Sequence, residues 1–336
     1  MDFITQRNKI EYVWLDGYKP EPTLRSKIKI VDRYYVDVLE VPEWSFDGSS
    51  TQQAKGSSSD LILKPVSLYK SPFESDQLVL CEVLDQVGIP HESNSRSKIR
   101  WINQAEYWFG FEQEYTLIKD GKPLGWPAGY IDATTLQNIA NKIDARMSTG
   151  REIMHEHISN CLEAGISLHG TNAEAMLGQW EYQVFGKGAI KAADSAWMAR
   201  YILYRTAERH GVDINIEPKP VKGPYSGNGL HANFSNDKMR NDSSKSYIHE
   251  ICEKMRPLHK EHIAEYGSKN EERLIGKFET QHINKFSYGV ADRGASIRIP
   301  LMMAQQGWNG YLEDRRPAGN ADPYRVVNRI ILTLEK

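Results

Sequence analysis

From position 108 the chain reads Trp108-Phe109-Gly110-Phe111-Glu112-Gln113-Glu114-Tyr115-Thr116-Leu117-Ile118, a stretch rich in aromatic and β-branched residues that predicts a β-strand. Alternate residues of a strand share one face, so Glu112 and Glu114 point the same way. Two neighbouring carboxylates repel each other unless a cation neutralises them. Two interpretations follow. The charges lie on a solvent-facing strand, or they form half of a site for Mg²⁺ or Mn²⁺, which bind carboxylate oxygens.

Length and composition limit the class of protein. The chain has 336 residues, enough for a large core and two domains; 40% are hydrophobic and 26% charged, as in globular proteins. A net charge of −2 gives no reason to expect a nucleic-acid partner. The three cysteines lie far apart, and we expect neither a signal peptide nor a membrane-spanning run. These features predict a cytoplasmic protein without a membrane role.

The first hundred residues predict a β-rich domain over 1–98. Strand-like stretches cover 10–15, 28–41 and 78–84, with loops of Gly, Pro and Ser between them. The stretches 44–51 and 56–60 are typical of polar turns when they are taken alone. A more polar segment, 91–98, precedes the Glu112 strand, and we place the domain boundary after it.

Residues 99–336 predict a second domain in which helices and strands alternate. Apolar residues at helical spacing predict helices over 151–164 and 189–210, and each stretch is followed by a glycine. Short strands are predicted over 212–217 and 230–234. Asp322 as N-cap and Pro323 at the first helical position predict a C-terminal helix.

Four further clusters carry side chains suited to catalysis. The carboxylates among them are Glu174, Glu181, Glu279 and Glu313, and the glycine-rich run 227–235 contains His231. Arg298 alternates with Ile297 and Ile299, which predicts an arginine that points from a strand into a cleft, where it could bind a carboxylate or phosphate. Solvent-exposed surface charge would explain each cluster taken alone. It explains poorly why all four clusters occur in the same chain. Two histidine groups do not predict a metal site: His155-Glu156-His157 lacks zinc-site spacing, and a solvated helix face explains His259 and His262.

In their order these motifs resemble glutamine synthetase, specifically its shorter type II form. The similarity runs from 14–17 through 44–50, 108–115, 178–181, 231–235 and 286–300 to Leu312-Glu313-Asp314-Arg315-Arg316-Pro317. The resemblance implies an α+β fold: an N-terminal β-grasp domain, then a catalytic domain with a curved antiparallel sheet flanked by helices. It also implies that ATP phosphorylates the γ-carboxylate of glutamate and that ammonia attacks the acyl phosphate, with two Mg²⁺ or Mn²⁺ ions required.

The resemblance also implies roles for individual residues. One cation would be held by Glu114, Glu174 and Glu181, and the other by Glu112, His231 and Glu313. Glutamate would contact Arg273, Arg315, Gly227 and His231, while Arg293 and Arg298 would face the transferring phosphate and the nucleotide. Trp108, Asn233, Ser235, Arg240 and Tyr311 match positions near ATP. Asp47 and Ser50 would bind ammonium, and Glu279 would close the site. The family assembles as two stacked pentameric rings whose sites are shared between subunits, which implies a homodecamer.

The chain departs from the family pattern in two places. Ser226 stands where asparagine is usual, beside the amino-acid substrate, and the segment 127–150 is shorter than usual. These departures leave a second hypothesis, a paralogue that joins glutamate to another amine. A third is a catalytically silent relative that senses nitrogen status, against which the full set of crowded carboxylates argues.

Overall fold

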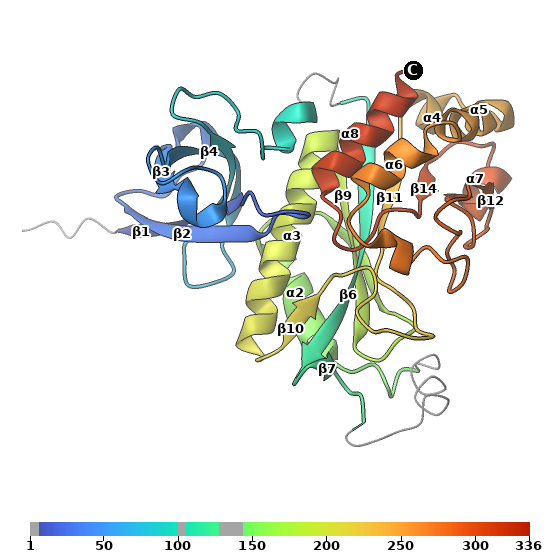
Figure 1. Ribbon diagram of the computed structural model, residues 1–336, viewed down its shortest axis with the longest axis horizontal. Coiled ribbons are helices and arrows are strands. Elements are labelled where there is room, and N and C mark those ends of the chain that lie inside the picture. The colour runs from blue at the N-terminus through green and yellow to red at the C-terminus, as the bar shows by residue number, and fades with distance from the viewer. Residues whose placement is uncertain (1–6, 100–104, 128–143) are drawn as a thin grey trace, which may run out of the picture. The chain divides into compact units, whose positions relative to one another are not determined.

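The computed structural model describes residues 7–99, 105–127 and 144–336, which pack as two compact units (Figure 1). One unit comprises Met1–Trp101 with Ser159–Ile166, and the other Ile102–Ile158 with Ser167–Lys336. The predicted domain boundary after residue 98 stays a prediction, since residues 100–104 lie outside the described ranges.

The first unit is built on a five-stranded sheet in the order β2-β1-β5-β4-β3. Its strands are β1 (Asn8–Leu15), β2 (Leu24–Val31), β3 (Trp44–Asp47), β4 (Asp60–Lys70) and β5 (Gln77–Leu84). The strands pair antiparallel except β1 and β5, which are parallel. Tyr12, Trp14, Phe46, Leu63 and Val79 belong to the apolar core on one face of this sheet.

The sequence predictions for this unit were partly wrong. The strand expected over 28–41 ends at Val31, and residues 38–40 form a 3₁₀ turn capped by the Asp37 carboxylate. The stretch 44–51, expected to be a polar turn, begins with β3, in which Trp44 and Phe46 alternate with polar residues, and then turns over Gly48–Thr51. β4 was not predicted at all.

The second unit is organised around β6 (Trp108–Lys119), the strand predicted from the Glu112 stretch. Its sheet has the order β12-β13-β14-β11-β6-β9-β8, and β7 and β10 pair with the far end of β6. The remaining strands are β7 (Lys122–Pro123), β8 (Leu168–Ala173), β9 (Gln179–Lys187), β10 (Asp213–Asn215), β11 (Leu230–Ser235), β12 (Tyr288–Val290), β13 (Ile297–Ile299) and β14 (Leu312–Asp314). The expected antiparallel pairing is found except between β12 and β13, which are parallel.

The helices in the described part of the chain are α2 (Arg151–Glu163), α3 (Ala189–Arg209), α4 (Asp237–Asn241), α5 (Lys245–Met255), α6 (His259–Glu265), α7 (Leu301–Gln305) and α8 (Pro323–Leu334). Helix α3 packs against β6, β9 and β10 of this sheet, and α8 packs against α3. The ends of α2 and α3 follow the prediction, because Gly165 and Gly211 adopt φ of +79° and +61°, which favour glycine. The Asp322 carboxylate accepts a hydrogen bond from the Tyr324 amide and caps α8 as predicted.

The two faces of β6 have different surroundings. Gln113 accepts a 2.6 Å hydrogen bond from Nε of Arg200 in α3, so the face with Phe109, Phe111 and Gln113 is the one that α3 covers. Because residues of a strand alternate, Glu112 and Glu114 lie on the opposite face. Helix packing therefore directs the two carboxylates away from the helical layer.

The predicted solvated face of α6 was wrong. His262 is fully buried, and its two ring nitrogens lie 2.6 Å from the Tyr266 hydroxyl and 2.8 Å from the Thr333 hydroxyl. His259 is also buried and lies 2.7 Å from the Ile283 carbonyl oxygen. Helix α8 packs against α6 and supplies Thr333, a neighbour distant in sequence that spacing within α6 could not reveal.

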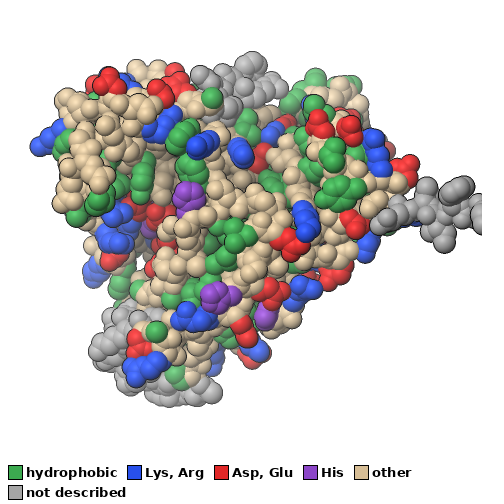
Figure 2. All heavy atoms as spheres, turned by 180° about the vertical axis from the view of Figure 1, so that it is seen from behind, with side chains coloured by type: hydrophobic (Ala, Val, Ile, Leu, Met, Phe, Trp, Pro, Cys, Tyr) green, Lys and Arg blue, Asp and Glu red, His purple; other side chains and the backbone are tan. Residues whose placement is uncertain are grey.

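The surface carries charges of both signs. On the face in Figure 2, acidic and basic side chains are interspersed with small apolar areas, consistent with the net charge of −2. Among the described residues, the helices are too short or too polar to span a bilayer.

Candidate active site

Adjacent strands bring the predicted ligands together. In the sheet register Glu112 lies opposite His231 of β11, and Glu114 lies opposite Glu181 of β9. Arg298 of β13 lies opposite Glu313 of β14. Residues from five stretches of sequence therefore reach one face at the centre of the sheet.

Two groups of side chains could each hold a cation. Glu112, His231 and Glu313 form the first group, and Glu114, Glu181 and His231 form the second; within each group the ligand atoms lie within 4.8 Å of one another. Nδ1 of His231 is 3.3 Å from Glu112 and 3.4 Å from Glu313, whereas Nε2 is 3.6 Å from Glu114. The imidazole thus lies between the two groups.

Glu174 stands slightly apart from its expected partners. It lines the same cavity as Glu114 and Glu181, and its carboxylate accepts a 2.7 Å hydrogen bond from the Asn172 side chain. In the structure His231, rather than Glu174, completes the group around Glu114 and Glu181.

Burial and mutual repulsion disfavour the charged forms of these acids. Burial, followed by the charges of Glu112 and Glu114, raises the pKa of Glu181 to about 9. Burial also raises the pKa of Glu114 and Glu174, and burial together with Arg315 lowers the pKa of His231 to about 3. A neutral imidazole among crowded carboxylates is a donor set that suits Mg²⁺ or Mn²⁺, whose charge would offset the repulsion.

Arginines border the carboxylates. Arg298 donates a 2.6 Å hydrogen bond to Glu313, and Arg315 donates to Glu313 from the other side. Arg273 lies 2.9 Å from Nε2 of His231, and burial lowers its pKa to about 10. The guanidinium groups therefore flank the acidic centre, where they could bind anionic substrates.

Glu279 and Arg293 lie on more exposed segments. Their side chains are 64% and 60% exposed and 3.8 Å apart. Phe278 and Glu279 both adopt left-handed backbone angles, with φ of 53° and 57°, which is costly for residues with a side chain. Arg315 donates hydrogen bonds to the backbone carbonyls of both Glu279 and Arg293, so it connects this segment to the acidic centre.

Three cavities follow one another along this face. The first, of about 570 Å³, and the middle one, of about 310 Å³, share Glu112 and Gln183 in their linings. The middle cavity and the third, of about 330 Å³, share Glu114, Glu174, His231, Glu279 and Arg315. Ser226, Gly227 and Arg273 also line the third cavity. Glu112 and Glu114 thus face successive cavities.

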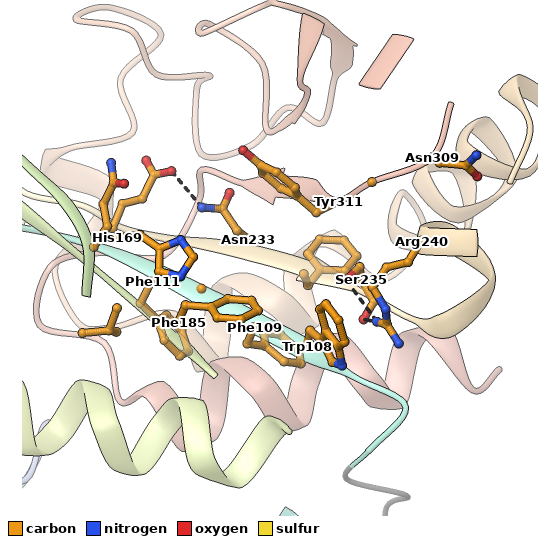
Figure 3. A pocket seen from close by; sticks show the side chains of 16 residues that line it. Trp108, Phe109, Phe111, His169, Phe185, Asn233, Ser235, Arg240, Asn309 and Tyr311 are labelled. Atoms are coloured by element: carbon orange, nitrogen blue, oxygen red, sulfur yellow. Dashed lines mark hydrogen bonds between the residues drawn. The ribbon is translucent and has the colours of Figure 1, made fainter. Parts of the chain in front are cut away.

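Several aromatic side chains line the first cavity (Figure 3). Trp108 and Tyr311 approach it from opposite sides, and Asn233 donates a 2.8 Å hydrogen bond to Glu112, which also lines the middle cavity. Arg240 lies 4.2 Å from the Trp108 ring centroid and donates to Ser235. Five of the six residues predicted to bind the nucleotide therefore line this one cavity, whereas the sixth, Arg298, lines the middle cavity.

Asp47 and Ser50 belong to the first compact unit and do not line these cavities. The exposed Asp47 carboxylate accepts hydrogen bonds from the amide and hydroxyl of Ser49, which lower its pKa below the usual range. Ser50 donates to the Asp47 carbonyl oxygen.

Sequence reasoning missed several lining residues. Gln183 donates a 2.9 Å hydrogen bond to Glu181, and alternation along the strand could have revealed it, because residues two apart share a face. His169 and Phe185, 4.8 Å apart between ring centroids, line the first cavity, but nothing in the local pattern distinguishes them from core residues.

Family comparisons agree with this geometry. Residues 6–86 match the glutamine synthetase β-grasp domain, and residues 101–255 match the glutamine synthetase catalytic domain. Glutamine synthetase of Bradyrhizobium diazoefficiens is 46% identical over 97% of this chain and 96% of its own.

The chain belongs to the glutamine synthetase family.

Other glutamine synthetases are similarly close. The protein of Emericella nidulans is 44% identical over 98% of this chain and 94% of its own, and the mitochondrial glutamine synthetase 1 of Drosophila melanogaster is 43% identical over 98% and 85%. The solved structure of Plasmodium falciparum glutamine synthetase matches with a TM-score of 0.75 at 18% identity, over 97% of this chain and 71% of that one. This structural likeness confirms the predicted β-grasp and catalytic fold.

Proposed function

We propose that the chain is an ATP-dependent glutamate–ammonia ligase that makes glutamine through γ-glutamyl phosphate. The observation that carries this proposal is the series of three cavities in which Glu112 borders the first and middle and Glu114 the middle and third. Such a series suits a nucleotide, a transferring phosphoryl group and an amino acid in succession. Membership of the chain in the glutamine synthetase family supports the same reaction.

Two divalent cations fit the middle cavity. We assign one to Glu112, His231 and Glu313, and the other to Glu114 and Glu181, with Glu174 joining from the same cavity. When bound, such cations neutralise the negative charge of phosphoryl oxygens. The carboxylates of this chain would hold the cations, and Arg298 and Arg293 line the same cavity.

The third cavity suits glutamate. Arg273 and Arg315 are buried cations that can bind carboxylates, and Gly227 gives the substrate close access to the backbone. His231 borders the same cavity beside Arg273. One γ-carboxylate oxygen of a glutamate lying here would attack the terminal phosphorus of ATP, with ADP as the leaving group.

Ammonium needs a negatively charged pocket. Asp47, kept ionised by its hydrogen bonds to Ser49, and Ser50 would supply that pocket. We propose that they serve a neighbouring copy of the chain in a homodecamer of two stacked pentameric rings. Asp47 would take a proton from ammonium, so that ammonia can attack the acyl phosphate. Glu279 would close the site, exclude water from the acyl phosphate and accept a proton from the tetrahedral adduct. We propose a cytoplasmic location.

The test is purified protein supplied with ATP, Mg²⁺, glutamate and ammonium. We expect release of phosphate that requires both glutamate and ammonium, with an equal amount of glutamine formed. Phosphate release that stays at background with Mg²⁺ and with Mn²⁺ would contradict the proposal.

A second candidate is ligation of glutamate to another amine. Ser226, which lines the third cavity beside Gly227, favours this candidate. The shortened segment 127–150 also motivates it, but residues 128–143 of that segment lie outside the described ranges. Comparing ammonium with small amines and polyamines at equal concentration separates the two activities, because the first candidate predicts the highest kcat/KM with ammonium.

A further inference from the structure

The loop 226–229 forms one wall of the third cavity, and the side chain of Asn228 anchors this loop by hydrogen bonds on the side away from the cavity. Asn228 lies between Gly227 and Gly229 and is fully buried. The two glycines face the site: a Cβ on Gly227 would lie 3.1 Å from Cγ of Arg273, and a Cβ on Gly229 would lie 2.4 Å from its guanidinium. The backbone of this loop therefore contacts Arg273, while the side chain of Asn228 binds elsewhere.

Every hydrogen-bonding position of the Asn228 amide is used. Its Oδ1 accepts from Thr116 of β6 at 3.2 Å and from Gln179 of β9 at 3.0 Å. Its Nδ2 donates to the carbonyl oxygens of Asn215 at 3.0 Å and Glu217 at 3.1 Å. One side chain thus connects two central strands to the chain that leads into the loop, with no lone pair or proton left over.

The neighbouring backbone groups complete the connection to the site. Gln179 donates a second hydrogen bond, of 2.9 Å, to the Gly227 carbonyl oxygen. The Gly229 amide donates a 2.6 Å hydrogen bond to Oε2 of Glu114. A displacement of this loop would therefore move a wall of the amino-acid cavity and release a hydrogen bond to one of the proposed cation ligands.

We propose that Asn228 is a positioning residue that fixes the loop 226–229 and thereby sets glutamate binding and the orientation of Glu114. This inference rests on the proposed function. Asn228 lines none of the three cavities, so it would act through Gly227 and Gly229. The first cavity, which suits the nucleotide, shares no lining residue with this loop, so ATP binding should be insensitive to Asn228.

The experiment compares wild type with Asn228→Ala in the glutamine-forming assay and in Mn²⁺ titrations followed by electron paramagnetic resonance. For Asn228→Ala we expect the KM for glutamate to rise about tenfold and Mn²⁺ binding to weaken, while the KM for ATP stays within twofold. Equal changes in both KM values, or none in the KM for glutamate and Mn²⁺ affinity, would overturn the inference. If wild type itself makes no glutamine, the proposed function fails instead.

Two further variants keep the result interpretable. Gln179→Met preserves volume but removes the hydrogen bonds to Asn228 and Gly227, so it should reproduce the selective rise in the KM for glutamate even if Asn228→Ala fails to fold; an unchanged ratio of the two KM values would count against the inference. Gln77→Ala is the matched control. It removes a buried amide that is hydrogen-bonded to the Tyr35 backbone in the first unit, and should lower stability without changing either KM.

Discussion

Glu114 and Glu181 lie directly opposite each other on the antiparallel strands β6 and β9, and both are buried. Like charges in such a pair destabilise a sheet. The chain nevertheless places four further acids in the same cavity, namely Glu112, Glu174, Glu279 and Glu313. A cation-binding role explains why these acids lie together. It also implies that their mutual repulsion lowers the stability of the metal-free protein.

Replacing Glu181 should therefore separate stability from activity. In chelator, Glu181→Gln should raise the free energy of unfolding at pH 8 by at least about 1 kcal/mol. The Glu181 carboxyl has a raised pKa in the folded state, so at this pH it ionises more readily in the unfolded chain and favours unfolding, whereas glutamine does not ionise. Activity should fall at least about a hundredfold, because a cation ligand is lost. Denaturant titrations and steady-state assays measure both quantities. A variant that is less stable than wild type in chelator would contradict this account. Glu250→Gln, at an exposed position on α5, is the control and should change neither.

Cation affinity should rise with pH. A cation that binds Glu181 displaces the proton held there by the raised pKa, so protons compete with the metal. Between pH 6 and pH 8.5 we expect the apparent Kd for Mn²⁺, measured by isothermal titration calorimetry, to fall by about tenfold or more. An affinity that is constant over this range would show that the carboxylates are already ionised.

Arg315 should not tolerate lysine. Its guanidinium donates to Glu313 and to the backbone carbonyls of Glu279 and Arg293, which a single ammonium group cannot do at once. Arg315→Lys should lower kcat/KM for glutamate by about ten- to a hundredfold. Arg256→Lys is the control, since Arg256, at the C-terminal end of α5, makes a comparable two-point pair with Glu253 on the surface. Equal activities of the two variants would remove Arg315 from the substrate site.

The buried His262 should make the fold sensitive to acid. Burial, followed by Arg316, lowers the pKa of His262 far below its usual range, so it is neutral when folded and protonated when unfolded below about pH 6.5. Wild type should lose about 1.4 kcal/mol of unfolding free energy per pH unit below that value through this group. His262→Gln should be less stable at pH 7 but should lack this part of the slope. Denaturant midpoints at pH 5, 6 and 7 test the difference, and parallel pH profiles would refute it.

Periodicity within single elements predicted the parts of the site that depend on one strand. Glu112 and Glu114 share a face, and Arg298 lies between two buried isoleucines and lines the middle cavity, as alternation predicts. The ends of α2 and α3 and the start of α8 were likewise predicted from single residues, the glycines after the two helices and the N-cap of the third.

What depends on register between strands could not be predicted in this way. The position of His231 between two groups of acids follows from the pairing of β11 with β6, and this pairing cannot be predicted from either strand alone. The same holds for Asn228, whose partners come from β6, β9, the end of β10 and the segment after β10. The sequence did not predict β4, because lysine and proline interrupt its apolar alternation. The strand nevertheless pairs with β5, and the pairing register shifts near Pro65.

The central claim is that one oxygen of the γ-carboxylate of glutamate is transferred to phosphate. Turnover of glutamate labelled with ¹⁸O in that carboxylate, with ATP, Mg²⁺ and ammonium, tests it in a single mass-spectrometric measurement of the released phosphate. The acyl-phosphate route predicts one ¹⁸O atom in each phosphate released with glutamine, because the oxygen that attacks phosphorus leaves the acyl carbon when ammonia attacks. Unlabelled phosphate, released in step with glutamine, would contradict the account.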